Sequence, residues 1–227
     1  MKKSGRLLEA VKEGLAPSYL NPYLKEALEL EPWLLTESQL ETQKLWQENT
    51  RPHMVEIGCY GGKNLMEMAL ANPHIEFYGL DITYKRVVKT ARKLKKQNLT
   101  NAHVVLAHAQ TFFTHHVPAE TLDGVFLFFP DPWPKDRHEK NSLISKNFAQ
   151  LMLKSLKKQG VFWLKTDHQP YFERSKEILL EAGFQLITET QGAETQPPQL
   201  AGGPYITAFQ NLFTKKEVGF AQALFMK

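Results

Sequence analysis

The strongest constraint on this chain is a strand-forming run that ends in three closely spaced prolines. Residues 125–129 (VFLFF) have the composition of a fully buried strand, and residues 130–134 read PDPWP. Proline has no backbone N–H to donate to a sheet, so the strand stops here. Ligands of open α/β sheets bind at the carboxyl ends of strands, which favours a ligand-binding loop around Asp131. The alternative is a proline-rich turn with a solvated charge cluster, since basic residues follow at 135–140.

Strand-like and helix-like segments alternate on both sides of this loop. Seven segments have the character of strands: 53–58, 75–81, 102–108, 123–129, 161–167, 184–190 and 217–227. Helical patterns occupy 63–73, 84–98, 145–158 and 171–182, and a Gly/Pro/Gln-rich loop covers 191–205. Strands that alternate with helices predict a mostly parallel, doubly wound sheet. The last two strands have no helix between them, so we expect them to pair antiparallel.

Residues 1–50 are expected to form an N-terminal helical extension to a main domain at 51–227. The helical segments of the extension are interrupted at Pro17, Pro22 and Pro32. The extension carries no recognisable catalytic or binding motif. Its apolar residues are expected to anchor it on the main domain: Trp33, Leu34, Leu35 and Trp46.

Charge and cysteine content narrow the class of protein. The net charge of +4 permits a nucleic-acid partner without requiring one. A single cysteine, Cys59, excludes an intrachain disulfide and a multi-cysteine metal site, which fits a reducing cytoplasm. The apolar runs are only as long as strands, so no membrane span is expected. The histidines lack zinc-site spacing, His115 and His116 are expected in a surface loop, and no metal is expected.

The first strand–turn–helix unit is a candidate nucleotide site. Gly58 ends the first strand, and glycine there lets a ligand approach the backbone closely. Asp81, at the end of the second strand, is placed to bind ribose hydroxyls. Glu56 lies inside the first strand, where glutamate is disfavoured, so it needs a buried partner. Two partners are open: the cationic amino group of a ligand, or a nearby Lys or Arg.

Two further groups of charges each have a structural and a functional interpretation. Helix 84–98 contains seven cations and no acid, so either a polyanion docks on it or its face is merely solvated. The cations are Lys85, Arg86, Lys89, Arg92, Lys93, Lys95 and Lys96. Lys165, Thr166 and Asp167 end a strand at the same sheet edge as Asp131, which predicts a cleft lined by acids and lysines. The alternative is that Thr166 or Asp167 caps the next helix.

Four motifs together resemble those of the bacterial tRNA (guanine-N7)-methyltransferases. They are the VEIG strand with its glycine turn, an acid after the second strand, PDPWPKDRHEK from Pro130 to Lys140, and KTD at 165–167. The PDPW-x-K-x-x-H element combined with KTD is highly specific, whereas the glycine turn is not. The resemblance covers Val55 to Gly183, and residues 206–210 match the family more weakly.

The resemblance implies a Rossmann-like class I methyltransferase fold with a mostly parallel seven-stranded sheet and a terminal antiparallel strand. It implies a cytoplasmic enzyme, monomeric or homodimeric, that methylates N7 of a guanine in the variable loop of tRNA with S-adenosylmethionine (SAM). Positions that match the family's cofactor site are Glu56, Gly58, Asp81, His108, Ala109 and Asp131, of which Asp131 also matches the catalytic residue. Substrate-binding positions are Lys135, Asp167, Thr207 and Gln210, and RNA-binding positions are Arg137, His138 and Lys140.

The chain departs from the family pattern at several positions. Tyr60 replaces the middle glycine of the family's G-x-G-x-G turn, and His108 stands where the family usually has Asn or Asp. Asn141 and Ser142 replace two arginines, and Gln210 replaces an acid. Two alternatives therefore stay open: a SAM-dependent enzyme with a different substrate, or an RNA-binding protein without catalysis. A nicotinamide-dependent oxidoreductase fits least, because the G-x-G-x-x-G fingerprint is missing.

Overall fold

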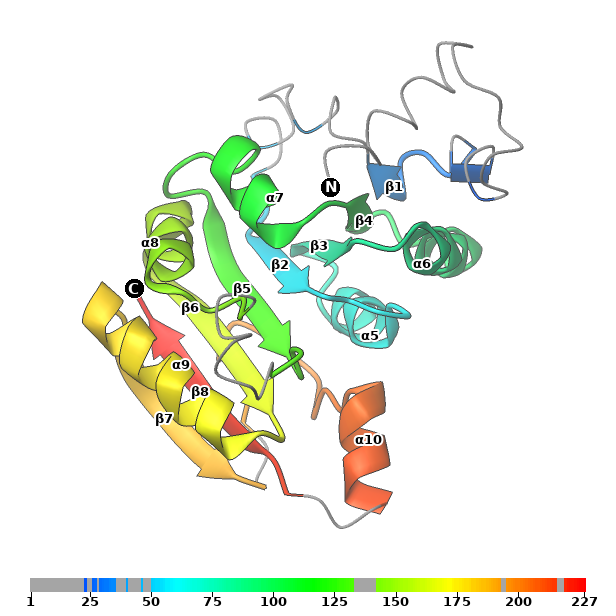
Figure 1. Ribbon diagram of the computed structural model, residues 1–227. Helices are drawn as coiled ribbons and strands as arrows, with labels where there is room; N and C mark the ends of the chain where they lie inside the picture. The colour runs from blue at the N-terminus through cyan, green and yellow to red at the C-terminus, as the bar shows by residue number, and fades with distance from the viewer. Residues whose placement is uncertain are drawn as a thin grey trace.

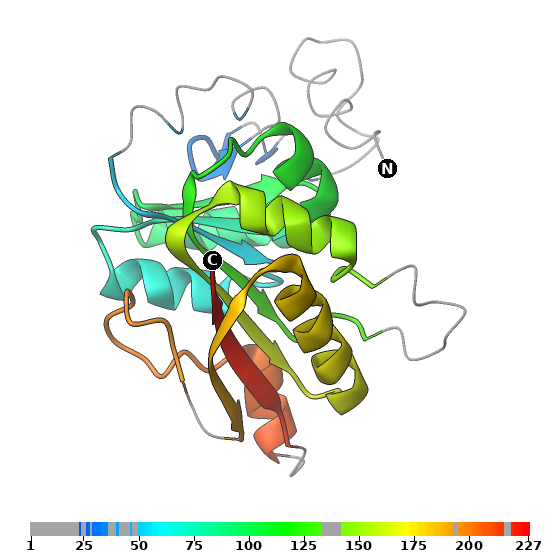
Figure 2. The same cartoon turned by 90° about the vertical axis from the view of Figure 1, so that its left-hand side faces the viewer.

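The computed structural model contains an eight-stranded sheet between two layers of helices (Figures 1 and 2). It describes Tyr23, Glu26, Ala27, residues 29–35, Leu40, Trp46, 50–132, 142–192, 195–215 (without the side chains of 213–215) and 219–227. The strands are β1 (Leu34–Leu35), β2 (His53–Ile57), β3 (Glu76–Asp81), β4 (Ala102–Leu106), β5 (Leu122–Phe128), β6 (Leu156–Thr166), β7 (Gln185–Gln191) and β8 (Ala221–Met226). The helices are α5 (Lys63–Ala71), α6 (Tyr84–Lys96), α7 (Ala109–His115), α8 (Lys146–Ser155), α9 (Gln169–Ala182) and α10 (Ala208–Lys215). Within the described residues, no helix is both long and apolar enough to cross a membrane.

The strand order β1-β4-β3-β2-β5-β6-β8-β7 is that of a doubly wound sheet. Strands β2 to β6 run parallel, as the alternation of elements predicts. Strand β8 pairs antiparallel with β6, and β7 pairs antiparallel with β8, which confirms the predicted terminal pairing. The carboxyl ends of the parallel strands therefore meet at one edge, and α10 lies near the arrowheads of β5 and β6 (Figure 1).

The central strands are buried on both faces, which explains their nearly continuous apolar runs. In β2, Val55 belongs to the apolar layer that includes residues of α7, α8 and α9, whereas Met54 belongs to the layer that includes residues of α5 and α6. In β5, Val125 belongs to the same layer as Val55, and Phe126 belongs to the same layer as Met54. Alternate side chains of one strand thus hold helices on opposite faces of the sheet.

The sheet has eight strands rather than the predicted seven, because part of the N-terminal extension joins it. Leu34 and Leu35 form β1 and pair in parallel with β4, so the interpretation of the extension as helical is wrong at these residues. The pairing covers the outer edge of β4 and buries both leucines. The predicted anchoring is confirmed: Trp33 Nε1 donates to the Leu99 carbonyl oxygen (2.6 Å), and Trp46 is buried.

Two local predictions are wrong, and one helix was not predicted. Helix α7 forms where the sequence predicts a surface loop, and His116 is buried at its C-terminal end. Helix α10 follows the predicted loop 191–205 in a segment without a predicted element. Strand β6 begins at Leu156, inside the predicted helix 145–158, because Leu156 pairs with β5 and is fully buried.

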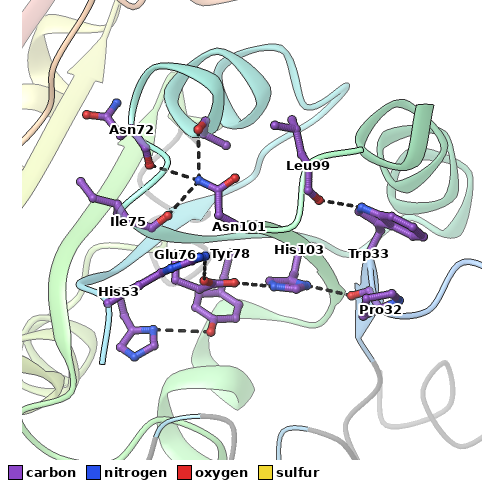
Figure 3. A network of polar contacts seen from close by, with 12 residues as sticks. Pro32, Trp33, His53, Asn72, Ile75, Glu76, Tyr78, Leu99, Asn101 and His103 are labelled. Carbon is purple, nitrogen blue, oxygen red and sulfur yellow. Dashed lines mark hydrogen bonds and ion pairs between the residues drawn. The ribbon is translucent and has the colours of Figure 1, made fainter. Parts of the chain in front are cut away.

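At the amino ends of the strands, a buried polar network ties the extension and α5 to β4 (Figure 3). The His103 ring bridges the Pro32 carbonyl oxygen (Nδ1···O 2.8 Å) and the Glu76 carboxylate (Nε2···Oε1 2.6 Å). Asn101 Nδ2 donates to three carbonyl oxygens at 3.0 to 3.1 Å. These carbonyls belong to Ala69, Asn72 and Ile75. One amide therefore satisfies the buried carbonyl groups where α5 ends and the chain enters β3.

The substitution Asn101→Asp should destabilise the fold by about 3 kcal/mol, because a carboxylate would then face three carbonyl oxygens in a buried site. Urea unfolding at neutral pH measures the change. The matched control is Asn98→Asp, at an exposed position just after α6, which should shift the free energy of unfolding by no more than about 0.5 kcal/mol. Equal stability of the two variants would contradict the role given to Asn101.

Candidate functional site

A cavity opens at the carboxyl ends of the parallel strands, where the sequence predicts a ligand site. It comprises a main chamber of about 380 Å³ and an adjoining second chamber of about 190 Å³. Both chambers are lined by Gly58, Tyr60, Phe128 and Phe209. The main chamber is also lined by Asp81, His108, Ala109 and Asp131, and the second chamber by Glu56. The six predicted cofactor-binding residues, far apart in the sequence, therefore surround two adjoining chambers.

The glycine turn forms the floor between the two chambers. The N–H groups of Gly58 and Cys59 both donate to the Leu80 carbonyl oxygen at 2.9 Å, which fixes the turn against β3. Gly58 has a φ of 75°, and Tyr60 has a φ of 50°, in the left-handed region that costs a non-glycine residue about 1 kcal/mol. The Tyr60 ring packs edge-on against Phe209 (5.5 Å between centroids). Tyr60 thus stands at the junction and leaves the main chamber open.

Asp81 is held in a defined orientation at the end of β3. Its side chain is buried, Oδ1 accepts from the Thr83 N–H (2.9 Å), and Oδ2 lies 3.4 Å from Arg86 Nη1. The Arg86 guanidinium also lies 4.7 Å from the centre of the Tyr60 ring. A carboxylate fixed in this way at the wall of the main chamber suits a pair of ribose hydroxyls.

Glu56 is a buried carboxylate with an unused oxygen. The backbone N–H of Leu65 hydrogen-bonds the carboxylate, but Oε2 has no partner among the described residues. Burial raises the pKa of Glu56 to about 8. Among those residues no Lys or Arg forms an ion pair with Glu56, so the structure does not support the intrachain alternative. The interpretation that remains is a ligand's cationic group.

The loop after β5 turns out of the sheet at Phe129. This residue has a φ of 49°, and its N–H donates to the Lys165 carbonyl oxygen of β6 (2.7 Å). Asp131 follows, exposed at the wall of the main chamber. Asp167 is exposed after the neighbouring parallel strand β6, outside the lining of both chambers. The two acids therefore share the sheet edge, as predicted.

Helix α9 is not capped by Thr166 or Asp167, so that alternative is wrong. Its N-cap residue is His168, whose Nδ1 accepts from the Tyr171 N–H (3.1 Å). Thr166 Oγ1 instead accepts from the His168 N–H (3.2 Å). Asp167 therefore keeps its carboxylate directed to solvent.

The segment before α10 is fastened to the buried Lys165. Lys165 Nζ donates to the Tyr205 carbonyl oxygen (3.1 Å) and to Gln210 Oε1 (3.3 Å), and it lies 4.6 Å from the centre of the Trp163 ring. The Gln210 N–H donates to Thr207 Oγ1 (2.8 Å). Of the two predicted substrate-binding residues here, Thr207 lines the second chamber, whereas Gln210 faces Lys165. The sequence predicted that Lys165 lines an open cleft together with the acids. This prediction is wrong, because Lys165 is fully buried.

The remaining predictions for the PDPW loop lie outside the described residues. They concern Lys135, Arg137, His138, Lys140 and Asn141.

Several cations of α6 bind acceptors of the chain itself, which neither sequence interpretation anticipated. Lys93 Nζ donates to the Gly61 carbonyl oxygen of the glycine turn (2.6 Å). Lys95 Nζ donates to the Glu29 carbonyl oxygen (3.2 Å), and Arg92 pairs with Glu26. Part of the helix's charge therefore holds the turn and the N-terminal extension in place.

Sequence reasoning missed Asn64, which lines the second chamber. Its side chain lies on the inward face of α5 and is 4% exposed, and neither Nδ2 nor Oδ1 has a partner among the described residues. The sequence contains one signal that could have identified Asn64: it is a polar residue next to Leu65 on the buried face of an amphipathic helix.

Known proteins with similar sequences are methyltransferases. A family described as "Putative methyltransferase" matches residues 50–223. A tRNA (guanine-N(7)-)-methyltransferase of Nitrosococcus oceani is 37% identical over 147 residues, 64% of this chain and 62% of that protein. One of Pseudomonas entomophila is 30% identical over 200 residues, 87% of this chain and 78% of that protein. The chain spans less than two thirds of the Nitrosococcus protein and only 54% and 58% of relatives from Alkalilimnicola ehrlichii and Nitrosomonas eutropha.

Solved structures share the fold at low sequence identity. The 16S rRNA methyltransferase KamB has a TM-score of 0.59 at 15% identity, over 85% of this chain and 94% of that one. The [4+2]-cyclase SpnF has a TM-score of 0.55 at 15% identity, over 85% of this chain and 82% of that one. These similarities confirm the Rossmann-like class I fold and carry no assignment of substrate.

The substitution Glu56→Gln should stabilise the ligand-free protein, and increasingly so as the pH rises. Glu56 ionises near 4.5 in the unfolded chain and near 8 in the fold, so the fold loses stability across this interval. Glutamine removes that loss, which is about 3 kcal/mol at pH 7. Urea unfolding at pH 5 and pH 7.5 measures it, with Glu67→Gln, a half-exposed position on α5, as the control that should keep the wild-type pH dependence. A constant difference between Glu56→Gln and wild type at the two pH values would contradict the burial argument.

Proposed function

The chain belongs to the bacterial tRNA (guanine-N7)-methyltransferase family, and from this premise we propose that it transfers a methyl group from SAM to N7 of a guanine in tRNA. The observation that carries the proposal is that each of the two adjoining chambers has a buried carboxylate in its wall. The main chamber has a fixed carboxylate, Asp81, and the second has Glu56, whose Oε2 has no partner among the described residues. SAM has matching groups: the ribose hydroxyls of its adenosine part and the ammonium group of its amino-acid part.

The residues of both chambers fit this cofactor. Asp81 would hold the ribose hydroxyls, since its two oxygens are already fixed by Thr83 and Arg86. Glu56 would bind the ammonium group, which supplies the cation that the described chain does not. His108 and Ala109 follow β4 and line the main chamber, so they would lie beside the adenosine part of the cofactor. When bound, SAM supplies an electrophilic methyl group on a cationic sulfur.

The residues around the substrate have mainly to align it. Guanine N7 carries a free lone pair, so no residue has to remove a proton before the attack. We propose that the carboxylate of Asp131, or that of the neighbouring Asp167, accepts hydrogen bonds from the N1–H and N2–H₂ groups of an extruded guanine. The family motif supports two further roles. Lys135 is proposed to bind the substrate, and the stretch from Arg137 to Lys140 is proposed to bind the tRNA backbone. Alignment and charge placement together account for the catalysis we propose.

A SAM-dependent enzyme with a different substrate is the second candidate. Gln210 stands where the family has an acid, and its amide is bound to the buried Lys165 instead of facing the chambers. Ser142 likewise stands where the family has an arginine. Both changes fall on the side of the substrate and not of the cofactor.

Calorimetric titration with SAM and a methyl-transfer assay on unmodified tRNA, followed by nucleoside analysis, test the proposal. We expect SAM binding and the formation of N7-methylguanosine. SAM binding without transfer to tRNA would favour the second candidate, and tRNA binding without SAM binding would favour an RNA-binding protein without catalysis.

The substitution Asp131→Ala should lower the rate of transfer about 100-fold or more, because it removes a substrate-orienting acceptor. The free energy of unfolding should stay unchanged, since Asp131 is exposed. Glu177→Gln, at an exposed position of α9, is the control and should leave the rate unchanged. Full activity of Asp131→Ala would rule out the role proposed for Asp131.

A further inference from the structure

The Asn64 amide is buried without a partner, which is unusual for a side chain that can both donate and accept hydrogen bonds. It lies in the first turn of α5, 4% exposed, and neither Nδ2 nor Oδ1 is bonded to any described residue. Folding removes both atoms from water without replacing their hydrogen bonds with water. An apolar side chain at this position would therefore give a more stable fold. Such a position points to a ligand that supplies the missing hydrogen bonds.

The second chamber contains one other side chain with the same property, Glu56. The two differ in what they lack: Glu56 Oε2 lacks a donor, and Asn64 lacks both a donor and an acceptor. A group that satisfies both must therefore offer donors and acceptors within about 190 Å³. An α-ammonium next to an α-carboxylate meets this requirement.

The lysines that line the same chamber are engaged elsewhere. Lys63 Nζ donates to Glu67 Oε2 (2.8 Å) and to the Ile206 carbonyl oxygen (2.9 Å). Lys93 Nζ donates to the Gly61 carbonyl oxygen (2.6 Å). Among the side-chain nitrogen atoms in the described wall of the chamber, Asn64 Nδ2 is thus the one that donates no hydrogen bond. A carboxylate entering next to Glu56 needs such a donor, because two carboxylates would otherwise repel each other.

We propose that Asn64 is a cofactor-binding residue whose Nδ2 donates to the α-carboxylate of SAM, while Glu56 binds the α-ammonium. Asn64 Oδ1 is then free to accept from the same ammonium, so that one zwitterion satisfies all three orphaned atoms. The inference rests on the proposed function and adds to it a residue that the family motifs do not include. It also gives this chain a means of preferring the intact amino-acid end over fragments of the cofactor.

Three ligands separate the contact with the carboxylate from other effects. They are SAM, decarboxylated SAM, which lacks only the carboxylate, and 5′-methylthioadenosine, which lacks the whole amino-acid end. Calorimetry with the variant Asn64→Leu should show about 10- to 100-fold weaker binding of SAM, the loss of a hydrogen bond to a charged group. 5′-Methylthioadenosine should bind within about twofold of its wild-type affinity, and decarboxylated SAM, which keeps only the contact between its ammonium group and Asn64 Oδ1, should lose clearly less affinity than SAM.

Thermal unfolding without ligand distinguishes a binding role from a structural one. The melting temperature of Asn64→Leu should be unchanged or raised, because the variant removes two unsatisfied polar atoms. A second variant, Asn64→Asp, keeps the side-chain volume and sets a carboxylate against that of the ligand. It should weaken SAM binding without weakening the binding of decarboxylated SAM.

The outcomes that overturn the inference differ from those that overturn the proposed function. Equal losses of affinity for all three ligands, or a lowered melting temperature with unchanged SAM binding, would assign Asn64 a structural role. Equal losses for SAM and decarboxylated SAM would place the contact away from the carboxylate. A wild-type protein that does not bind SAM would overturn the proposed function, and the inference with it.

Discussion

The parallel hydrogen-bond ladder from β4 through β3, β2 and β5 to β6 is the constraint on which the site depends. In a parallel sheet every strand ends at the same edge, so residues that follow different strands come together without any contact between them along the sequence. Asp81, Asp131 and Asp167 reach this edge from three separate strands. A shift of β2 by one residue would turn Val55 to the opposite apolar layer, so the register depends on how the side chains fit within their own layers.

The second chamber differs from the polar network at the amino ends of the strands. At the amino ends of the strands, buried polar groups are matched: His103 bridges two acceptors and Asn101 serves three carbonyls. In the second chamber, Glu56 and Asn64 are buried with unmatched atoms. A stable fold carries such mismatches where they serve binding, since the ligand supplies the partners. The contrast between the two ends separates the stabilising end of the sheet from the functional one.

Apolar runs predicted the main strands and the sheet edge, and residues at strand ends predicted Glu56, Gly58, Asp81 and Asp131 as parts of a ligand site. The family resemblance added His108 and Ala109, which complete the six residues around the two chambers. It did not predict β1, since two leucines form a strand only when β4 offers an edge to pair with. Lys165 was predicted to line a cleft, but the rings of Trp163 and Phe128 lie beside its ammonium group. Asn64 escaped notice because an unmatched polar atom is a property of three-dimensional surroundings and not of a pattern.

Two departures from the family pattern are connected in space. Tyr60 takes a left-handed conformation in which glycine is the usual residue, and its ring rests against Phe209 of α10. Helix α10 is fastened in turn by Gln210, whose amide oxygen accepts from the buried Lys165. The backbone strain at Tyr60 is thus offset by packing against a helix that the second departure helps to hold. We therefore interpret the two changes as parts of one rearranged wall of the site, which encloses the junction of the two chambers with aromatic side chains.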